Sequence, residues 1–441
     1  MNTATEKRQK KLYGIFPMIS KKLLASFPGK EKIIDFFLFS LPQISGLLCS
    51  FIGVVLWTNL IDPSIYGQYN VIVSILNTLA CVCLSGLGIS MNISAAHAKF
   101  GNYLKIIKYR IACSIVGSII ICVIPFVPAF KMASLKYPLL LVALLFPVWN
   151  LSLAKDWLTG EKRFKIVAGI EILVDIISLS LMFIFVFMLR LKTLTVLLLI
   201  LMGLQTIVNT LITLHVWQYI IKPSKEKRND EKIIHYGIHQ TFASLLSIAL
   251  PMQNIFLAQF LTFPQLAIFV VARLFPDQIK LVFGIVSRMF FPYLASFPDL
   301  KSLWDWVQYR FVFLTIFFFC IGILGYFAIS YLVPYLFSAK YGTAAQYGKW
   351  MFLTLAMLAP CSLFNIILQT RIHYTRYLYV SMFFASLVSI GSLFMFVPKF
   401  GLWGGVYAYI SYILFQSTFF TLSFIHYYNK EQRIAYAAVS R

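Results

Sequence analysis

The chain has 441 residues, of which 60% are hydrophobic, 17% aromatic and only 12% charged. A soluble domain typically has roughly half apolar and about a quarter charged residues, so this composition excludes an ordinary soluble protein. The 38 Lys and Arg residues exceed the 15 Asp and Glu residues and give a formal charge of +23. Because these cations cluster at the edges of apolar stretches, they indicate the loops of a membrane protein and argue against a nucleic-acid partner.

A transmembrane helix needs about 20 predominantly apolar residues, and the sequence predicts twelve such spans in two sets of six. After a basic tail, residues 1–32, the first set occupies residues 33–221 and consists of Ile33–Leu60, Asn70–Ala96, Lys105–Phe130, Leu139–Leu158, Ile166–Leu189 and Thr195–Ile221. The second set occupies residues 233–428 and consists of Ile233–Leu261, Gln265–Phe297, Val307–Phe337, Tyr347–Gln369, Tyr377–Val397 and Leu402–Tyr428. A polar linker, residues 222–232, separates the two sets, and a short tail, residues 429–441, follows.

The basic residues also predict the orientation of the spans. They concentrate in alternate loops, at Lys7–Lys32, Lys99–Arg110, Lys155–Lys165 and Lys222–Lys232. Cytoplasmic loops carry such an excess, so we expect both termini to be cytoplasmic in a multi-pass protein of the bacterial inner membrane. The first span lacks a small-residue cleavage site, which favours a retained span over a removed signal.

The two sets of spans show signs of an internal repeat. Pro147 and Pro360 lie in the fourth span of each set, and each is followed sixteen residues later by Arg and an aromatic residue, at Arg163 and Arg376. The pattern predicts two six-helix bundles related by a pseudo-twofold axis along the membrane normal, because an even number of spans returns the chain to the same side. A cavity between the bundles near the membrane midplane would follow.

Several kinds of chemistry lack their usual sequence signals. After the N-terminal tail no predicted loop exceeds roughly a dozen residues, too few for the loop domains that hold sugar substrates in membrane enzymes. The sequence has no Gly-x-x-x-x-Gly-Lys-Ser/Thr loop for nucleotide phosphates, and His235 and His239 are best explained as interfacial residues. The seven cysteines lie in apolar stretches and are interpreted as packing residues. We therefore expect a protein that is not an enzyme and needs neither a metal nor a cofactor.

The eighth predicted span carries charges inside the membrane, where they normally face a cavity or a partner. Arg273, Asp277 and Lys280 have the spacing i, i+4, i+7 and share one helix face, which Ser287 and Arg288 continue. One interpretation is an Arg273–Asp277 pair that only stabilises the helix. The other is a binding site for an anionic substrate, since the face keeps an excess of positive charge.

Uncharged polar residues form a similar stripe on the second span. Asn70, Ser74 and Asn77 repeat the i, i+4, i+7 spacing. Amides and hydroxyls suit sugars, but hydrogen bonding between helices is their commoner use in membranes, so both interpretations stay open.

Other polar residues are candidates for the same cavity. Gln43 in the first span and Asn254 in the seventh could line it, as could Asp35 unless it pairs with nearby lysines. Glu171 and Asp175 share a face of the fifth span and are either a structural charge cluster or ion-coupling carboxylates. Asp35 and Asp277 are further candidates for ion coupling.

Three segments of this sequence resemble a known family. They are Asn59–Tyr69 with the following Ser85–Ile89, Trp157–Phe164, and Ser287–Pro292. With the span count and the six-plus-six division, they are similar to the Wzx-type polysaccharide flippases of the multidrug/oligosaccharidyl-lipid/polysaccharide (MOP) exporter superfamily. The turn at Phe263–Ala267 departs from the family pattern because it lacks the usual glycines.

The resemblance implies a MATE-like fold and translocation of an undecaprenyl-pyrophosphate-linked oligosaccharide across the inner membrane, for O-antigen or capsule assembly. Arg273 and Lys280 would then bind the pyrophosphate, with Asp277 tuning their charge. The expected partners are membrane lipids, a polysaccharide polymerase and the chain-length machinery. Two alternatives remain: a drug or cation exporter of the same superfamily, whose cavity should favour carboxylates and aromatic faces, and a polysaccharide polymerase or acyltransferase.

Overall fold

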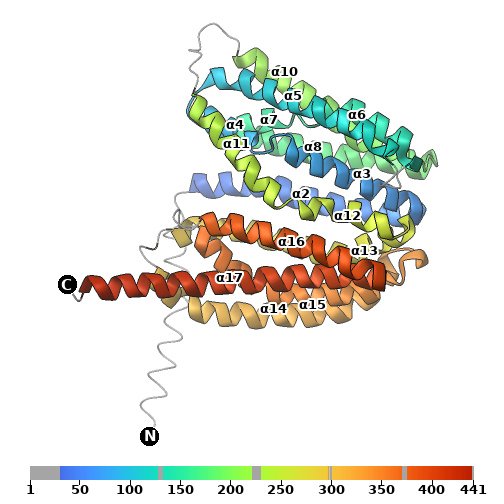
Figure 1. The fold of residues 1–441 in the computed structure, drawn as a ribbon. Coiled ribbons are helices and arrows are strands. Elements are labelled where there is room, and N and C mark those ends of the chain that lie inside the picture. The colour runs from blue at the N-terminus through green and yellow to red at the C-terminus, as the bar shows by residue number, and fades with distance from the viewer. Residues whose placement is uncertain are drawn as a thin grey trace.

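The computed structural model describes residues 30–127, 133–220, 230–295, 297, 300–369 and 375–439, and these residues form helices joined by short turns (Figure 1). The helices of the first half are α2 (Lys30–Leu60), α3 (Pro63–Val82), α4 (Leu87–Ala96), α5 (Phe100–Val123), α6 (Lys136–Trp149), α7 (Leu153–Gly160), α8 (Phe164–Met182), α9 (Leu194–Leu198) and α10 (Leu204–Ile220). Those of the second half are α11 (Glu231–Leu246), α12 (Ala249–Phe260), α13 (Phe263–Ala295), α14 (Leu300–Leu336), α15 (Ala344–Gln369), α16 (Thr375–Phe400) and α17 (Leu402–Val439). Short 3-10 turns occur at Ile124–Phe126, Ala133–Leu135 and Ala339–Tyr341, and π-helical turns at Phe183–Met188 and Leu199–Gly203.

Each of the twelve predicted spans corresponds to one helix or to a run of consecutive helices. Within the described residues, eleven helical stretches are long and apolar enough to cross a membrane. The eighth predicted span, α13, is not among them because Arg273, Asp277 and Lys280 interrupt its apolar character. The chain is therefore a multi-pass all-α membrane protein with about twelve spans, as the sequence predicts.

Some predicted boundaries are wrong by several residues. The second span begins at Pro63 instead of Asn70, because the Asp62 side chain accepts a 2.9 Å hydrogen bond from the Ser64 amide and Pro63 suits the first helical turn. The last helix continues past the predicted end at Tyr428 to Val439 and projects beyond the bundle in Figure 1.

Three predicted spans are broken near their middles. The break between α3 and α4 includes Leu84 in a left-handed conformation, with φ of 58°. The break between α6 and α7 follows Pro147, and the break between α11 and α12 precedes Pro251. Pro251 falls in the first turn of α12, where its missing N–H costs no helical hydrogen bond. α2, by contrast, continues through Pro42 without a break.

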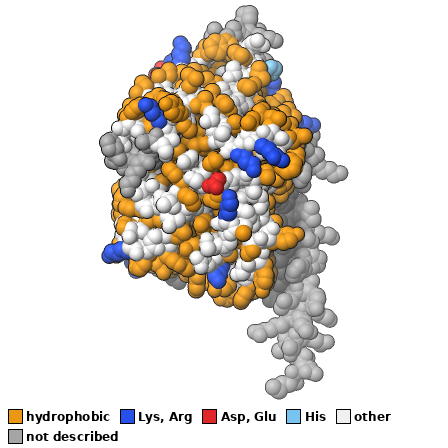
Figure 2. Space-filling view, turned by 90° about the vertical axis from the view of Figure 1, so that its right-hand side faces the viewer, with side chains coloured by type: hydrophobic (Ala, Val, Ile, Leu, Met, Phe, Trp, Pro, Cys, Tyr) orange, Lys and Arg blue, Asp and Glu red, His pale blue; other side chains and the backbone are white. Residues whose placement is uncertain are grey.

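The two halves lie one above the other in Figure 1 and meet along α3, which packs against α12 and α13. We call the end of the molecule with residues 97–99, 161–163 and 230 the basic end, and the end with Asp62, Thr262 and Lys340 the opposite end. Figure 2 views the opposite end, where hydrophobic and uncharged side chains form most of the surface and charged side chains are scattered.

At the opposite end, hydrogen bonds and an ion pair join the two halves. The Asn59 amide donates to the Leu336 carbonyl at 2.7 Å, and the Ser338 hydroxyl donates to the Thr58 carbonyl at 3.1 Å. The Lys340 ammonium lies 3.5 Å from the Asp62 carboxylate. α3 and α13 also approach closely here, since a Cβ on Gly67 would overlap the Phe263 carbonyl. The halves are thus held together at this end.

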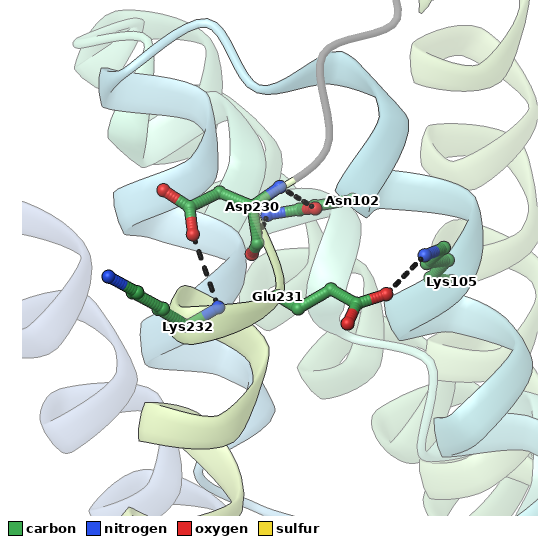
Figure 3. Close-up of polar contacts among 5 residues, drawn as sticks. All are labelled: Asn102, Lys105, Asp230, Glu231 and Lys232. Atoms are coloured by element: carbon green, nitrogen blue, oxygen red, sulfur yellow. Dashed lines mark hydrogen bonds and ion pairs between the residues drawn. The ribbon is translucent and has the colours of Figure 1, made fainter.

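At the basic end, the described residues join the halves on one flank. α11 crosses onto the first half and packs against α4, and the beginning of α11 docks against α5 (Figure 3). Asn102 exchanges two 3.0 Å hydrogen bonds with the backbone of Asp230, and Lys105 pairs with Glu231 at 3.0 Å. The other flank, between α2, α7, α8 and α13, contains a cavity.

Candidate functional site

A cavity of about 1240 Å³, which we call the central cavity, lies between the two halves. Its wall comes from α2, α4, α7 and α8 of the first half and from α13 of the second. The polar and charged side chains of this wall are Gln43, Ser50, Asn92, Lys155, Asp156, Thr159, Glu171, Asp277 and Lys280. Most of them lie toward the basic end, so the cavity occupies that part of the molecule.

Four of the predicted site residues line this cavity: Gln43, Glu171, Asp277 and Lys280. They come from three different helices that are far apart in sequence. The structure thus places side chains of α2, α8 and α13 around one cavity between the halves.

The charge of the cavity differs from the expected positive excess. Among the described residues, its lining contains two ammonium groups, Lys155 and Lys280, and three carboxylates, Asp156, Glu171 and Asp277. The expectation came from the stripe on α13 alone; it did not count Glu171 of α8 and missed Asp156, the carboxylate that α7 contributes. Lys155 lies 3.9 Å from Glu171, so the first-half wall partly neutralises itself.

Arg273 is engaged inside the second half. Its Nε donates to Asp277 at 2.6 Å, and its Nη1 donates to the Gln253 side chain of α12 at 2.5 Å. The intrahelical pair that the spacing allowed is therefore present, and Arg273 is not among the residues that line the central cavity. Asp277 connects Arg273 to the central cavity, because it pairs with Arg273 and also lines the cavity.

Lys280 has no such ion pair among the described residues. Its Nζ lies 5.8 Å from the centre of the Tyr412 ring, a cation–π distance. The side chain is held by α13 and packs against an aromatic residue of α17, which leaves the ammonium as a donor for a bound anion.

The predicted stripe on α3 does not act as one surface. Ser74 accepts a 2.9 Å hydrogen bond from Asn254 of the second half, and both side chains are buried, so this pair joins the halves. Asn70 donates to the Tyr66 carbonyl of its own helix at 2.8 Å, and Asn77 is exposed. Within the stripe, the interpretation as a helix–helix contact holds for Ser74. Asn254, a candidate for the central cavity, is buried in that contact and is not part of the cavity lining.

Asn70 and Asp175 instead meet in a second cavity of about 370 Å³ inside the first half, which we call the first-half cavity. Trp57, Tyr66 and Tyr69 contribute aromatic rings to its wall. The backbone of Asp35 belongs to α2, but its side chain lies outside the described part of the structure, as do those of Ser287 and Arg288.

The sequence reasoning missed Lys155, Asp156 and Thr159 of α7. Asp156 lies within the fourth predicted span, and a carboxylate inside a span is itself a signal for a cavity or a partner. Its carboxylate also approaches α4, since a Cβ on Gly88 would lie 2.6 Å from Asp156 Oδ2. Asp156 could therefore have been identified as a site residue from the sequence alone.

Arg110 was also missed, because it lies near the start of a predicted span, Lys105–Phe130, at the end of the basic stretch Lys99–Arg110. Its guanidinium is buried and donates to the Cys83 carbonyl at the end of α3 and to the Asn150 carbonyl, at 3.3 Å, at the end of α6. It also donates to the Asn150 side chain at 2.6 Å. A cation at two helix C-termini offsets their partial negative charge and satisfies carbonyls that the breaks leave free.

The arrangement belongs to a known class of membrane fold. The structure is similar to a MOP superfamily transporter from Pyrococcus furiosus, with a TM-score of 0.53 at 12% identity, covering 92% of this chain and 96% of that one. It is also similar to the bent form of the Vibrio cholerae MATE transporter VcmN, with a TM-score of 0.52 at 14% identity, covering 90% and 97%.

A MATE structure in complex with MaL6 gives a TM-score of 0.51 at 13% identity, covering 91% of this chain and 96% of that one. No family model and no curated protein sequence matches the chain. The chain thus has the MATE-like fold of two helical bundles, as the sequence resemblance implies, and identities this low establish the fold alone.

Proposed function

We propose that the protein translocates an undecaprenyl-pyrophosphate-linked oligosaccharide from the cytoplasmic to the outer leaflet of the bacterial inner membrane. Its two halves would rock about α3 to expose the central cavity to each side in turn. The N- and C-termini would be cytoplasmic, and the glycan would enter O-antigen or capsule assembly, with the polymerase and chain-length machinery as partners.

Lys280 carries this proposal. It is an ammonium without an ion-pair partner among the described residues, on the wall of a cavity otherwise rich in amides, hydroxyls and carboxylates. Lys280 would hold the pyrophosphate, while Gln43, Asn92 and Asp156 would accept and donate hydrogen bonds to sugar hydroxyls. The volume of about 1240 Å³ exceeds the roughly 300 to 1,000 Å³ of a drug-sized site, which suits an oligosaccharide.

A drug or cation exporter is the second candidate, and a specific observation favours it. Asp156, Glu171 and Asp277 place three carboxylates around the central cavity, and carboxylates attract cationic drugs. In that case Lys280 would be a neutralising partner of Asp277 instead of an anion ligand.

The test uses a bacterial strain that lacks the gene and measures which leaflet exposes the sugars of its lipid-linked oligosaccharides. We expect a complete repeat unit confined to the cytoplasmic leaflet, rescued by the unmodified gene and by Lys349→Gln but not by Lys280→Gln. Lys349 is the matched control because its Nζ also lies over a tyrosine ring, 5.3 Å from the centre of the Tyr326 ring. Unlike Lys280, it is not part of the central cavity lining.

Full rescue by a correctly inserted Lys280→Gln protein would exclude the role of Lys280. Unchanged glycans together with altered drug tolerance in the strain without the gene would favour the exporter. Normal sidedness with unpolymerised glycan outside would favour an enzyme.

A further inference from the structure

A separate cavity inside the second half shares Lys280 with the central cavity. This second-half cavity has a volume of about 230 Å³ and lies between α13, α15 and α17. Lys280 lines both cavities, so the cavities adjoin at this residue. Among the described residues, Lys280 is the charged member of the second-half lining.

The rest of that lining is mainly apolar. Phe283, Leu355, Leu358, Ala359, Ile366 and Phe420 contribute hydrocarbon surface. Two of the polar members are already engaged within their own helix, because Ser362 donates to the Ala359 carbonyl at 2.7 Å and Asn365 accepts from Gln369 at 3.4 Å. Gln416 is the remaining polar member, so the cavity offers a mainly hydrocarbon wall with Lys280 as the one cation of its described lining.

A ligand that fits this wall has an anionic group bonded directly to an apolar chain. The anion would bind Lys280, the polar remainder would extend into the central cavity, and the apolar chain would enter the second-half cavity. A free sugar phosphate or a hydrophilic drug would leave this hydrocarbon wall unused. The volume is below that of a drug-sized site, so only a short part of a long chain can enter.

We propose that the second-half cavity binds the pyrophosphate-proximal prenyl units of the lipid carrier. The proposal rests on the proposed function, because it takes a prenyl pyrophosphate as the carrier of the sugar. It adds that the protein recognises the beginning of the lipid chain as well as its headgroup, while the remainder of the chain stays in the bilayer.

The first experiment measures affinity on the unmodified protein in lipid nanodiscs, with inorganic pyrophosphate and pyrophosphates carrying one, two, three or more prenyl units. If the pocket is finite, the affinity should rise by about tenfold or more over the first one or two prenyl units, because these units bury apolar area in the pocket. Further units should then leave the affinity unchanged. Partition into the bilayer alone would instead raise the apparent affinity steadily with chain length, which would overturn the proposal. Protein-free nanodiscs give the partition baseline.

The second experiment fills the cavity. Ala359→Phe places a ring in the second-half cavity, and Met357→Phe places the same ring on the exposed face of the same helix. We expect Ala359→Phe to abolish the gain from prenyl units and to leave inorganic pyrophosphate binding unchanged, with no effect of Met357→Phe. Ser362→Leu, a smaller change in the same lining, should reduce the gain and covers the case in which Ala359→Phe does not fold.

These outcomes separate the two proposals. One outcome is that Lys280→Gln loses pyrophosphate binding while the affinity of the unmodified protein does not depend on prenyl chain length. That outcome would support the headgroup site and exclude the prenyl site. Absence of pyrophosphate binding to the unmodified protein, together with normal leaflet sidedness in cells, would exclude the proposed function itself.

Discussion

Arg110 shows how one buried cation can stabilise two interrupted helices. It lies on α5, is 5% exposed, and donates to carbonyls at the ends of α3 and α6. Asn150 connects it further to Ser114 through a 2.8 Å hydrogen bond. Both breaks therefore depend on a residue from a third helix.

We expect Arg110→Met to be strongly destabilising. The substitution removes three hydrogen bonds and leaves carbonyl oxygens unsatisfied inside the bundle, which should cost on the order of 3 kcal/mol. Lys108→Met is the control, since Lys108 is an exposed residue of the same helix. The measurement is the midpoint of thermal unfolding of the purified proteins in one detergent. Equal midpoints for both variants would contradict the stabilising role of Arg110.

At the scale of helices, the close crossing of α4 and α11 joins the halves on one flank of the basic end. The Gly86 amide donates to Thr241 Oγ1 at 3.1 Å, and the Ser90 hydroxyl donates to the Ile233 carbonyl at 2.5 Å. A Cβ on Gly86 would overlap the Gly237 carbonyl and lie 2.6 Å from the Thr241 amide nitrogen. Glycine is needed here because two backbones touch.

Gly86→Ala should therefore force the two helices apart and destabilise the protein by about 1 to 3 kcal/mol, the usual cost of overpacking. Gly169→Ala tests the same change in α8, where a Cβ would meet nothing within 4 Å. There the substitution should be neutral or stabilising by up to about 1 kcal/mol, since Ala favours helix. The measurement is the midpoint of thermal unfolding of both variants. Equal midpoints for Gly86→Ala and Gly169→Ala would contradict a close backbone contact between α4 and α11 at Gly86.

Hydropathy was sufficient to predict most of the spans, because a span needs a long apolar run whatever its neighbours are. α13 is the exception, since three charges interrupt its apolar run. Hydropathy could not predict the breaks. Leu84 and Gly86 lie in an apolar run that hydropathy reads as one helix, and the break is stabilised by Arg110 and Thr241 from elsewhere in the chain. Proline is no sure guide either, because α12 begins just before Pro251 whereas α2 continues through Pro42.

Part of the site was also predictable from the hydropathy of the spans. Charges within spans, such as Asp277 and Lys280, are costly enough to indicate a cavity from the sequence alone. The sequence alone does not show whether Ser74 contacts a bound sugar or the side chain of Asn254. The answer depends on which helix packs opposite Ser74. The net charge of the cavity likewise required the helices of the first half to be placed against α13.

At the scale of the whole molecule, the proposed alternating access requires the halves to separate at the opposite end, where Asp62 and Lys340 form an ion pair. Their side chains are 57% and 59% exposed, so the pair contributes little stability but is accessible to reagents. We expect a cleavable bifunctional thiol reagent that joins Asp62→Cys to Lys340→Cys, in a protein with its native cysteines replaced, to stop transport in proteoliposomes. Reduction of the link should restore transport, and each single-cysteine protein treated in the same way should stay active. Undiminished transport by fully cross-linked protein would exclude a mechanism in which the halves part at this end.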